Sequence, residues 1–186
     1  MEKQDPMTIR RTQAQRSAAT QDALRTAARA LWGERGYAEV GTPEIAQRAG
    51  VTRGAMYHQY ADKAALFLDV VETVEADVMT RLGAAVVAEA PASPAAALHA
   101  AVDAWLDISA EREIRQLILL DAPNVLGWNG FRDIAERYSL GMTEQLLQAA
   151  IDAQQVKLDK HRSDDFESRF YEACEAVAKE KVRNAI

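Results

Sequence analysis

Apolar residues recur at intervals of three and four along most of this chain, which is the spacing of one face of an α-helix. The first such stripe predicts a helix over residues 17–34 and consists of Leu24, Ala27, Ala28 and Leu31. A second stripe predicts a long helix that Asp62 caps, formed by Phe67, Val70, Val71, Val74, Val78 and Leu82. No segment shows the apolar–polar alternation of a convincing strand. We therefore expect an all-α protein.

Signals for helix starts and stops divide the front of the chain into short pieces. Thr42 followed by Pro43 is typical of a helix start, and we expect Thr42 to cap this helix. Gly50 ends it after about two turns, and Thr52 can cap the next helix over residues 53–59. These two short helices and the helix before them form a compact unit, so we expect an N-terminal tail and head domain over residues 1–61.

The remainder, residues 62–186, predicts a larger helical domain. Ser93 and Pro94 start one helix, whose apolar side carries Leu98, Ala101, Val102 and Trp105. A short apolar run over residues 114–120 comes next, and the sequence VLGWNG at residues 125–130 is typical of a turn-rich connection.

Two more helices are expected towards the end of the chain. One starts at Phe131 and carries Ile134, Ala135, Tyr138, Met142, Leu146 and Ala149 on its apolar face. The last starts at about Ser163 and carries Phe166, Phe170, Cys174 and Val177. Cys174 lies on the apolar stripe, so we interpret it as a buried side chain rather than a redox sensor.

Charge and composition narrow the class of protein. Residues 1–61 hold nine Lys and Arg against six Asp and Glu, whereas the rest holds 13 against 22, within a net charge of −6. A basic head on an acidic body suggests that the head faces a polyanion. The single cysteine excludes a disulfide framework, and no HxxxH, HExxH or CxxC spacing indicates a metal site. With no apolar run long enough for a membrane span and no signal peptide, we expect a cytoplasmic protein without a cofactor.

Residues 42–60, TPEIAQRAGVTRGAMYHQY, have the pattern of a DNA-binding helix-turn-helix. A small core can lock the two helices together: Ile45, Ala46, Ala49, Val51, Met56 and Tyr60. The opposite face of the second helix carries Arg53, Gly54, Tyr57 and His58.

The chemistry of that face fits DNA. Arg53 can reach guanine O6 and N7, and Gly54 lets the backbone approach base edges. Tyr57 and His58 can donate to phosphate oxygens, and Thr52 can bind a phosphate or a base. Two further phosphate contacts are expected at helix starts, from Thr42 and Lys63.

The strings AARALWGERGYAEVG and TPEIAQRAGVTRGAMYHQYADKAALF resemble the DNA-binding region of the TetR/AcrR transcriptional regulators. DAPNVLGWNGFRDIAERYSLGM is similar to a segment of their second domain, and the resemblance spans about residues 15–155. It implies an all-α homodimer with a three-helix head and a helical ligand-binding and dimerisation domain. Such proteins usually repress transcription at a near-palindromic operator until a small molecule releases them. The same seven residues are the DNA-contact positions that the resemblance implies.

Seven residues of the second domain are candidates for binding a small, partly apolar effector: Met79, His99, Trp105, Asp121, Trp128, Tyr138 and Met142. The apolar members can equally be ordinary core, because core residues have the same helical spacing. Asp121 can instead cap a helix before Pro123 or form a salt bridge.

Two alternatives to the repressor stay open. The 31 residues after Gln155 include 14 Lys, Arg, Asp and Glu and fit one helix, where the family usually has two long apolar ones. The chain could then be a helical ligand-binding or interaction module with impaired specific DNA binding. A small all-α enzyme is the other alternative, but GxSxG, GxxxxGK[ST] and GxGxxG motifs are absent from the sequence.

Overall fold

The computed structural model describes residues 12–155, and every regular element in that part of the chain is helical. The all-α prediction is therefore confirmed. The elements are α1 (Gln13–Arg35), α2 (Thr42–Arg48), α3 (Arg53–Gln59), α4 (Lys63–Ala88), α5 (Pro94–Ala110), α6 (Arg112–Ile114), the π-helical η1 (Arg115–Asp121), α7 (Ala122–Ala135), the π-helical η2 (Glu136–Leu140) and α8 (Gly141–Asp152).

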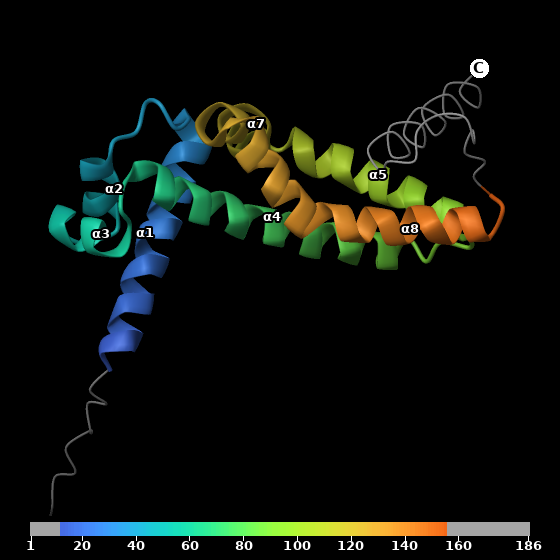
Figure 1. The fold of residues 1–186 in the computed structure, drawn as a ribbon, viewed down its shortest axis with the longest axis horizontal. Coiled ribbons are helices and arrows are strands. Elements are labelled where there is room, and N and C mark those ends of the chain that lie inside the picture. Colours follow the sequence, from blue (N-terminus) through green and yellow to red (C-terminus); the bar gives the residue numbers. More distant parts are fainter. Residues whose placement is uncertain (1–11, 156–186) are drawn as a thin grey trace, which may run out of the picture.

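Helices α1, α2 and α3 form a head at one end of the molecule (Figure 1). The predicted core of the helix-turn-helix is confirmed, because Ile45, Met56 and Tyr60 are buried in the same cluster. Trp32 of α1 is fully buried and packs edge-on against Phe67 at the start of α4, with ring centroids 5.3 Å apart. The head is thus joined to the first turns of α4 by a shared apolar core.

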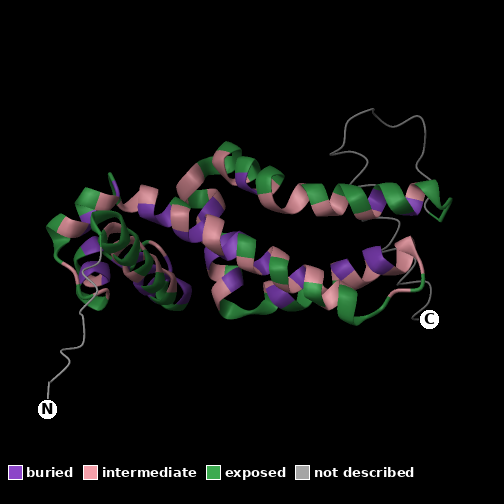
Figure 2. Ribbon diagram, turned by 90° about the horizontal axis from the view of Figure 1, so that it is seen from below, coloured by how far each residue is buried: buried purple, intermediate pink, exposed green. Residues whose placement is uncertain are grey.

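The body is an elongated set of helices that extends away from the head (Figure 1). Helix α4 leads out of the head along the body, α5 packs against α4, and α8 packs against α5. Figure 2 shows that the buried residues of α4 form a stripe along the helix, as the apolar pattern predicted. The division at residues 61 and 62 falls between α3 and α4, and it stays a prediction that the two parts are separate domains.

Side-chain caps fix several helix starts. Thr52 Oγ1 accepts from Ala55 N at 3.1 Å, Asp62 Oδ1 from Ala65 N at 2.7 Å and Ser93 Oγ from Ala96 N at 3.2 Å. These three bonds confirm the predicted caps, each of which satisfies a backbone N–H that the helix itself leaves unpaired.

Other boundaries differ from the prediction. Helix α1 begins at Gln13, capped by Thr12, four residues earlier than expected. Gly41 is the N-cap of α2, and Thr42 is already helical, so Thr42 does not cap. Residues 125–130 lie within α7, where a kink at Gly127 (φ +71°) is the only non-helical residue in the segment.

Two further segments were predicted from their apolar residues, the run at residues 114–120 and a helix from Ser163. The apolar run at residues 114–120 is mostly the π-helix η1, a bonding pattern that apolar spacing does not reveal. The helix expected from Ser163, with Cys174, lies outside the described residues. No helix of the described part combines the length and apolar character needed to cross a bilayer.

Candidate DNA-binding surface and body cavity

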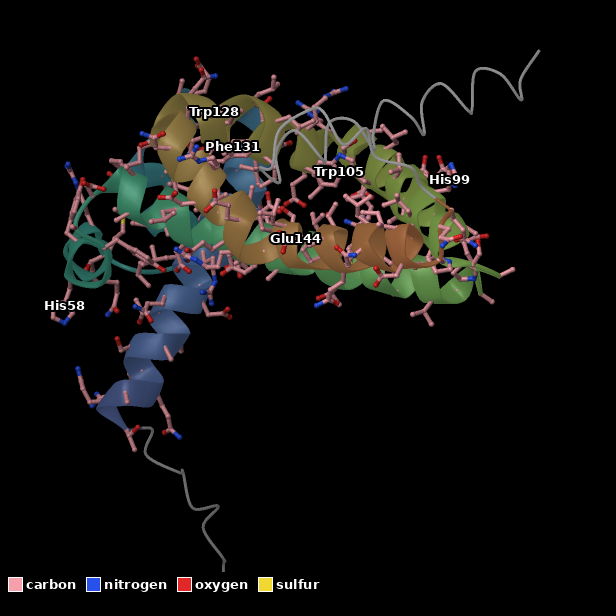
Figure 3. The ribbon with its side chains drawn as sticks, turned by 45° about the vertical axis from the view of Figure 1, so that its right-hand side comes forward. His58, His99, Trp105, Trp128, Phe131 and Glu144 are labelled. Atoms are coloured by element: carbon pink, nitrogen blue, oxygen red, sulfur yellow. The ribbon has the colours of Figure 1, made fainter. Side chains whose placement is uncertain are left out.

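The outer face of α3 presents the predicted DNA-contact residues to solvent. Arg53, Gly54, Tyr57 and His58 are all exposed, while Met56 on the opposite face is fully buried. His58 lies at the tip of the head, remote from His99 at the other end of the body (Figure 3). The fold therefore brings these four residues together on one accessible surface, and their contact with DNA stays a prediction.

A hydrogen bond between α2 and α3 holds Tyr57. The Tyr57 Oη and Thr42 Oγ1 atoms are 3.1 Å apart, and the Arg53 guanidinium lies 5.6 Å from the centre of the Tyr57 ring. The bond with Thr42, followed by the bond with Arg53, lowers the pKa of the Tyr57 phenol. Thr42 is buried, with 7% of its surface exposed, so it is placed to orient Tyr57 while Tyr57 itself stays 43% exposed.

Lys63 is placed differently from the expected free cation at a helix start. Its Nζ donates to the Tyr37 carbonyl oxygen at 2.6 Å and lies 3.9 Å from the centre of the Tyr37 ring. Burial lowers its pKa. In this structure Lys63 fastens the start of α4 to the turn after α1, and a phosphate would have to share its ammonium with Tyr37.

The body contains a cavity of about 420 Å³, a volume typical of small-molecule sites. Its walls come from α4, α5, η1, α7, η2 and α8, and most of the side chains are apolar. The lining residues are Glu75, Met79, Leu82, Leu98, Ala101, Val102, Trp105, Ile118, Leu119, Phe131, Ala135, Ser139, Leu140, Met142, Thr143, Leu146 and Leu147.

Glu75 is the one charged residue among the described residues that line the cavity. Only 4% of its surface is exposed, and its carboxyl has no hydrogen-bond or ion-pair partner among the residues that the structure describes. Burial raises the pKa of the Glu75 carboxyl to about 7. Sequence reasoning missed Glu75, although its position between Val71 and Val78 interrupts the apolar stripe of α4 and is itself a signal.

The predicted effector residues divide into two groups. Met79, Trp105 and Met142 line the cavity, so their contact with an effector stays a prediction. Four others do not line it, which corrects their assignment: His99, Asp121, Trp128 and Tyr138.

Each correction has a local reason. His99 Nδ1 lies 2.9 Å from the Ala95 carbonyl oxygen of its own helix. Trp128 is 62% exposed, packs against Phe131 at a centroid distance of 6.0 Å, and directly follows the kink at Gly127. Tyr138 packs against the main core without reaching the cavity surface.

Asp121 instead connects the body to the head. Its Oδ2 accepts from the Tyr37 backbone N at 2.8 Å, so it neither binds in the cavity nor caps a helix. Nearby, the Arg29 guanidinium donates to both carboxylate oxygens of Glu113, at 2.9 and 3.0 Å. Arg112 also donates to the Glu34 carbonyl oxygen at 2.7 Å. Segment α6 is therefore bonded directly to α1, and η1 to the turn that follows α1.

Within residues 12–155, no three or more His, Cys, Asp and Glu side chains are grouped as metal ligands. The expectation that the chain needs no metal stays a prediction.

Comparison with known proteins gives the class of protein. The family described as "Bacterial regulatory proteins, tetR family" matches residues 24–70, and "Tetracyclin repressor-like, C-terminal domain" matches residues 95–162. Together the two matches span more than half of the chain. The chain belongs to the TetR family of transcriptional regulators, with a helix-turn-helix head and a helical C-terminal domain.

Individual relatives are distant. The chain is 25% identical over 142 residues to the transposon Tn10 TetC protein of Escherichia coli, covering 74% of this chain and 68% of that one. A TetR-family regulator from Pectobacterium atrosepticum is 28% identical, with a TM-score of 0.67 over 90% of this chain and 80% of that chain.

Two other solved structures share the fold. RolR in complex with resorcinol is 21% identical, with a TM-score of 0.64 over 80% of this chain and 71% of that chain. SmeT, the repressor of the Stenotrophomonas maltophilia multidrug efflux pump SmeDEF, is 23% identical. Its TM-score is 0.56 over 84% of this chain and 72% of that chain.

Proposed function

We propose that this protein is a dimeric transcriptional repressor that acts in the cytoplasm and leaves its operator when a small, partly apolar molecule enters the body cavity. The observation that carries the proposal is the pairing of two features in one chain. The exposed face of α3 holds Arg53, Gly54, Tyr57 and His58, and the body encloses a cavity of about 420 Å³. RolR, which shares the fold, was solved with a small aromatic ligand, resorcinol.

The DNA-binding step follows from the chemistry of α3. A helix of this kind enters the major groove, where Arg53 can pair with a guanine while Tyr57 and His58 hold phosphates. In this proposal Thr52 supplies a further phosphate contact. Lys63 contacts a phosphate while it shares its ammonium with Tyr37, and Thr42 contributes by holding Tyr57. Two heads about 34–36 Å apart would read successive major grooves, which is why a dimer is required for an inverted-repeat operator.

The release step needs a connection between the cavity and the head, and two elements supply one. Helix α4 starts in the head and carries Glu75, Met79 and Leu82 of the cavity wall. Segment η1 carries Ile118 and Leu119 of the same wall and ends at Asp121, which binds Tyr37 N. An effector that fits one arrangement of these elements better than another shifts the spacing of the two heads.

Binding of the chain to its own upstream intergenic DNA, compared with a scrambled duplex at about 0.15 M salt, tests the proposal. Salt is fixed because phosphate contacts alone give strongly salt-dependent, non-specific affinity. We expect clear preference for the upstream fragment. Equal and weak binding to both duplexes would instead favour an interaction module whose head does not read sequence.

A further inference from the structure

We infer that the body cavity selects apolar effectors that carry a protonated amine, and that Glu75 receives this amine. The inference rests on the proposed function, because it names the chemical class of molecule that binds in the body cavity. It is based on the polar atoms of the cavity wall, which can accept hydrogen bonds from a ligand but do not donate hydrogen bonds to it.

Glu75 is a charged residue in an otherwise apolar part of the cavity wall. It lies on the buried face of α4, one turn from Val71 and Val78, and faces a wall that is otherwise apolar on the α4 side, with Met79 and Leu82 beside it. Only 4% of the surface of Glu75 is exposed, and its carboxyl lacks a hydrogen-bond or ion-pair partner within the described part of the chain. A buried carboxyl without a partner is costly, so a group that pairs with it recovers free energy.

The two hydroxyls of the cavity wall already donate their protons to backbone carbonyl oxygens. Ser139 Oγ donates to the Ala135 carbonyl oxygen at 2.8 Å, and Thr143 Oγ1 donates to the Ser139 carbonyl oxygen at 3.0 Å. Each hydroxyl has a single proton, which these backbone bonds use, so only its lone pairs face a ligand. Both hydroxyls therefore act as acceptors toward the cavity, as the ionised Glu75 does.

The described part of the cavity wall holds no cationic side chain. The lining residues that the structure describes include no lysine, arginine or histidine. When Glu75 is ionised, an anionic ligand would meet a carboxylate and two acceptors with nothing to neutralise it, which is unfavourable in an apolar site. The ionised site therefore disfavours anions and favours molecules that donate hydrogen bonds.

An amine is favoured over an alcohol because of charge. An alcohol supplies one neutral donor, whereas an ammonium supplies three donors and a positive charge to pair with Glu75. At about pH 8 the empty protein already bears the cost of burying this carboxylate, so forming the pair adds the desolvation of the ligand but not that of Glu75. The apolar majority of the wall requires the rest of the molecule to be hydrocarbon or aromatic.

Three probes of one shape test the inference: 1-naphthylmethylamine, 1-naphthylmethanol and 1-naphthoate, each titrated into the full chain by calorimetry at about pH 8, where Glu75 is mostly ionised. We expect the amine to bind about tenfold or more tighter than the alcohol, and the carboxylate to bind most weakly. Glu75→Gln should reduce the affinity for the amine about tenfold and change that for the alcohol less than about threefold.

Glu144→Gln is the matched control, because Glu144 is an exposed carboxylate on α8, next to Thr143, that does not line the cavity (Figure 3). It should bind all three probes as the original chain does. The ranking of the probes on the original chain needs no variant, so the inference stays testable if Glu75→Gln does not fold. Equal binding of amine and alcohol, tighter binding of naphthoate, no binding of the amine, or an unchanged affinity in Glu75→Gln would overturn it.

DNA release is measured separately, so that failure of the inference and failure of the proposed function are distinguishable. If the amine binds through Glu75 but never displaces DNA, the inference holds and the repressor mechanism fails. If a carboxylate displaces DNA by binding the same cavity, the mechanism holds and the inference fails.

Discussion

Glu75 is a single buried charged residue whose position the sequence alone does not determine. The sequence places it in the apolar stripe of α4, but spacing alone does not tell whether a charge on that stripe turns outward or stays buried. The structure settles this, because α5, α7 and η2 pack against α4, and α8 packs on α5, leaving Glu75 in the lining of a cavity. The stability of the protein should therefore depend on the ionisation of this one group.

The pKa of Glu75 is about 7 in the folded chain, against an ordinary value of 4.5. Between those values the folded chain binds more protons than the unfolded chain, so the stability contribution falls as pH rises from about 4.5 to 7. Glu75→Gln removes this dependence. We expect the stability of the variant relative to the original chain to rise by about 3 kcal/mol from pH 4 to pH 9, order of magnitude.

Chemical denaturation of both chains across that pH range measures this difference, and groups that titrate equally in both chains cancel from it. A difference that stays constant with pH would mean that Glu75 is not held in an apolar environment.

Arg53 is the residue on which specificity should depend. Arg53→Ala should cost about 1–3 kcal/mol of binding to the preferred duplex and relax the choice of base at one position. Arg115→Ala is the control, since it removes the same charge from an exposed site in the body. Anisotropy titrations against duplexes changed one base pair at a time test this, and an equal loss on every duplex would make Arg53 a phosphate contact.

At the scale of elements, the sequence predicted helices where capping residues and apolar stripes agree. Thr52, Asp62 and Ser93 all cap, because each precedes a helix whose first N–H groups need an acceptor. Thr42 was misplaced by one position, since Gly41 takes the cap and the Thr42 hydroxyl bonds Tyr57. The π-helix η1 was not predictable, because its bonding pattern depends on packing rather than on local propensity.

Segment η1 leads to a prediction about coupling. Asp121→Ala leaves the Tyr37 N–H without its acceptor and should destabilise the fold by about 1–3 kcal/mol. Because Asp121 does not line the cavity, the variant should bind effector as before but need more of it to release DNA. Asp133→Ala, at an exposed site on α7, should behave as the original chain.

Parallel measurements of effector affinity and of DNA release distinguish coupling from binding. Unchanged release in Asp121→Ala would show that η1 does not transmit the signal and would leave α4 as the route.

At the scale of the whole molecule, charge and shape separate two tasks. Residues 1–61 carry an excess of basic side chains, while the rest is acidic within a net charge of −6. The head lies at one end and the body extends from it, so DNA can approach α3 without meeting the acidic body (Figure 1). Composition predicted this split, whereas the cavity could not be predicted, because its walls come from segments distant in the sequence.

Selection of bound duplexes from a random pool, at about 0.15 M salt, measures whether α3 reads DNA sequence. We expect enrichment of an inverted repeat whose half-sites are centred about one helical turn apart, roughly 10 base pairs, or a small multiple of that spacing. Arg53→Ala should enrich the same repeat with one position relaxed. Recovery of no preferred sequence, with binding that depends only on salt, would mean that α3 does not read DNA sequence.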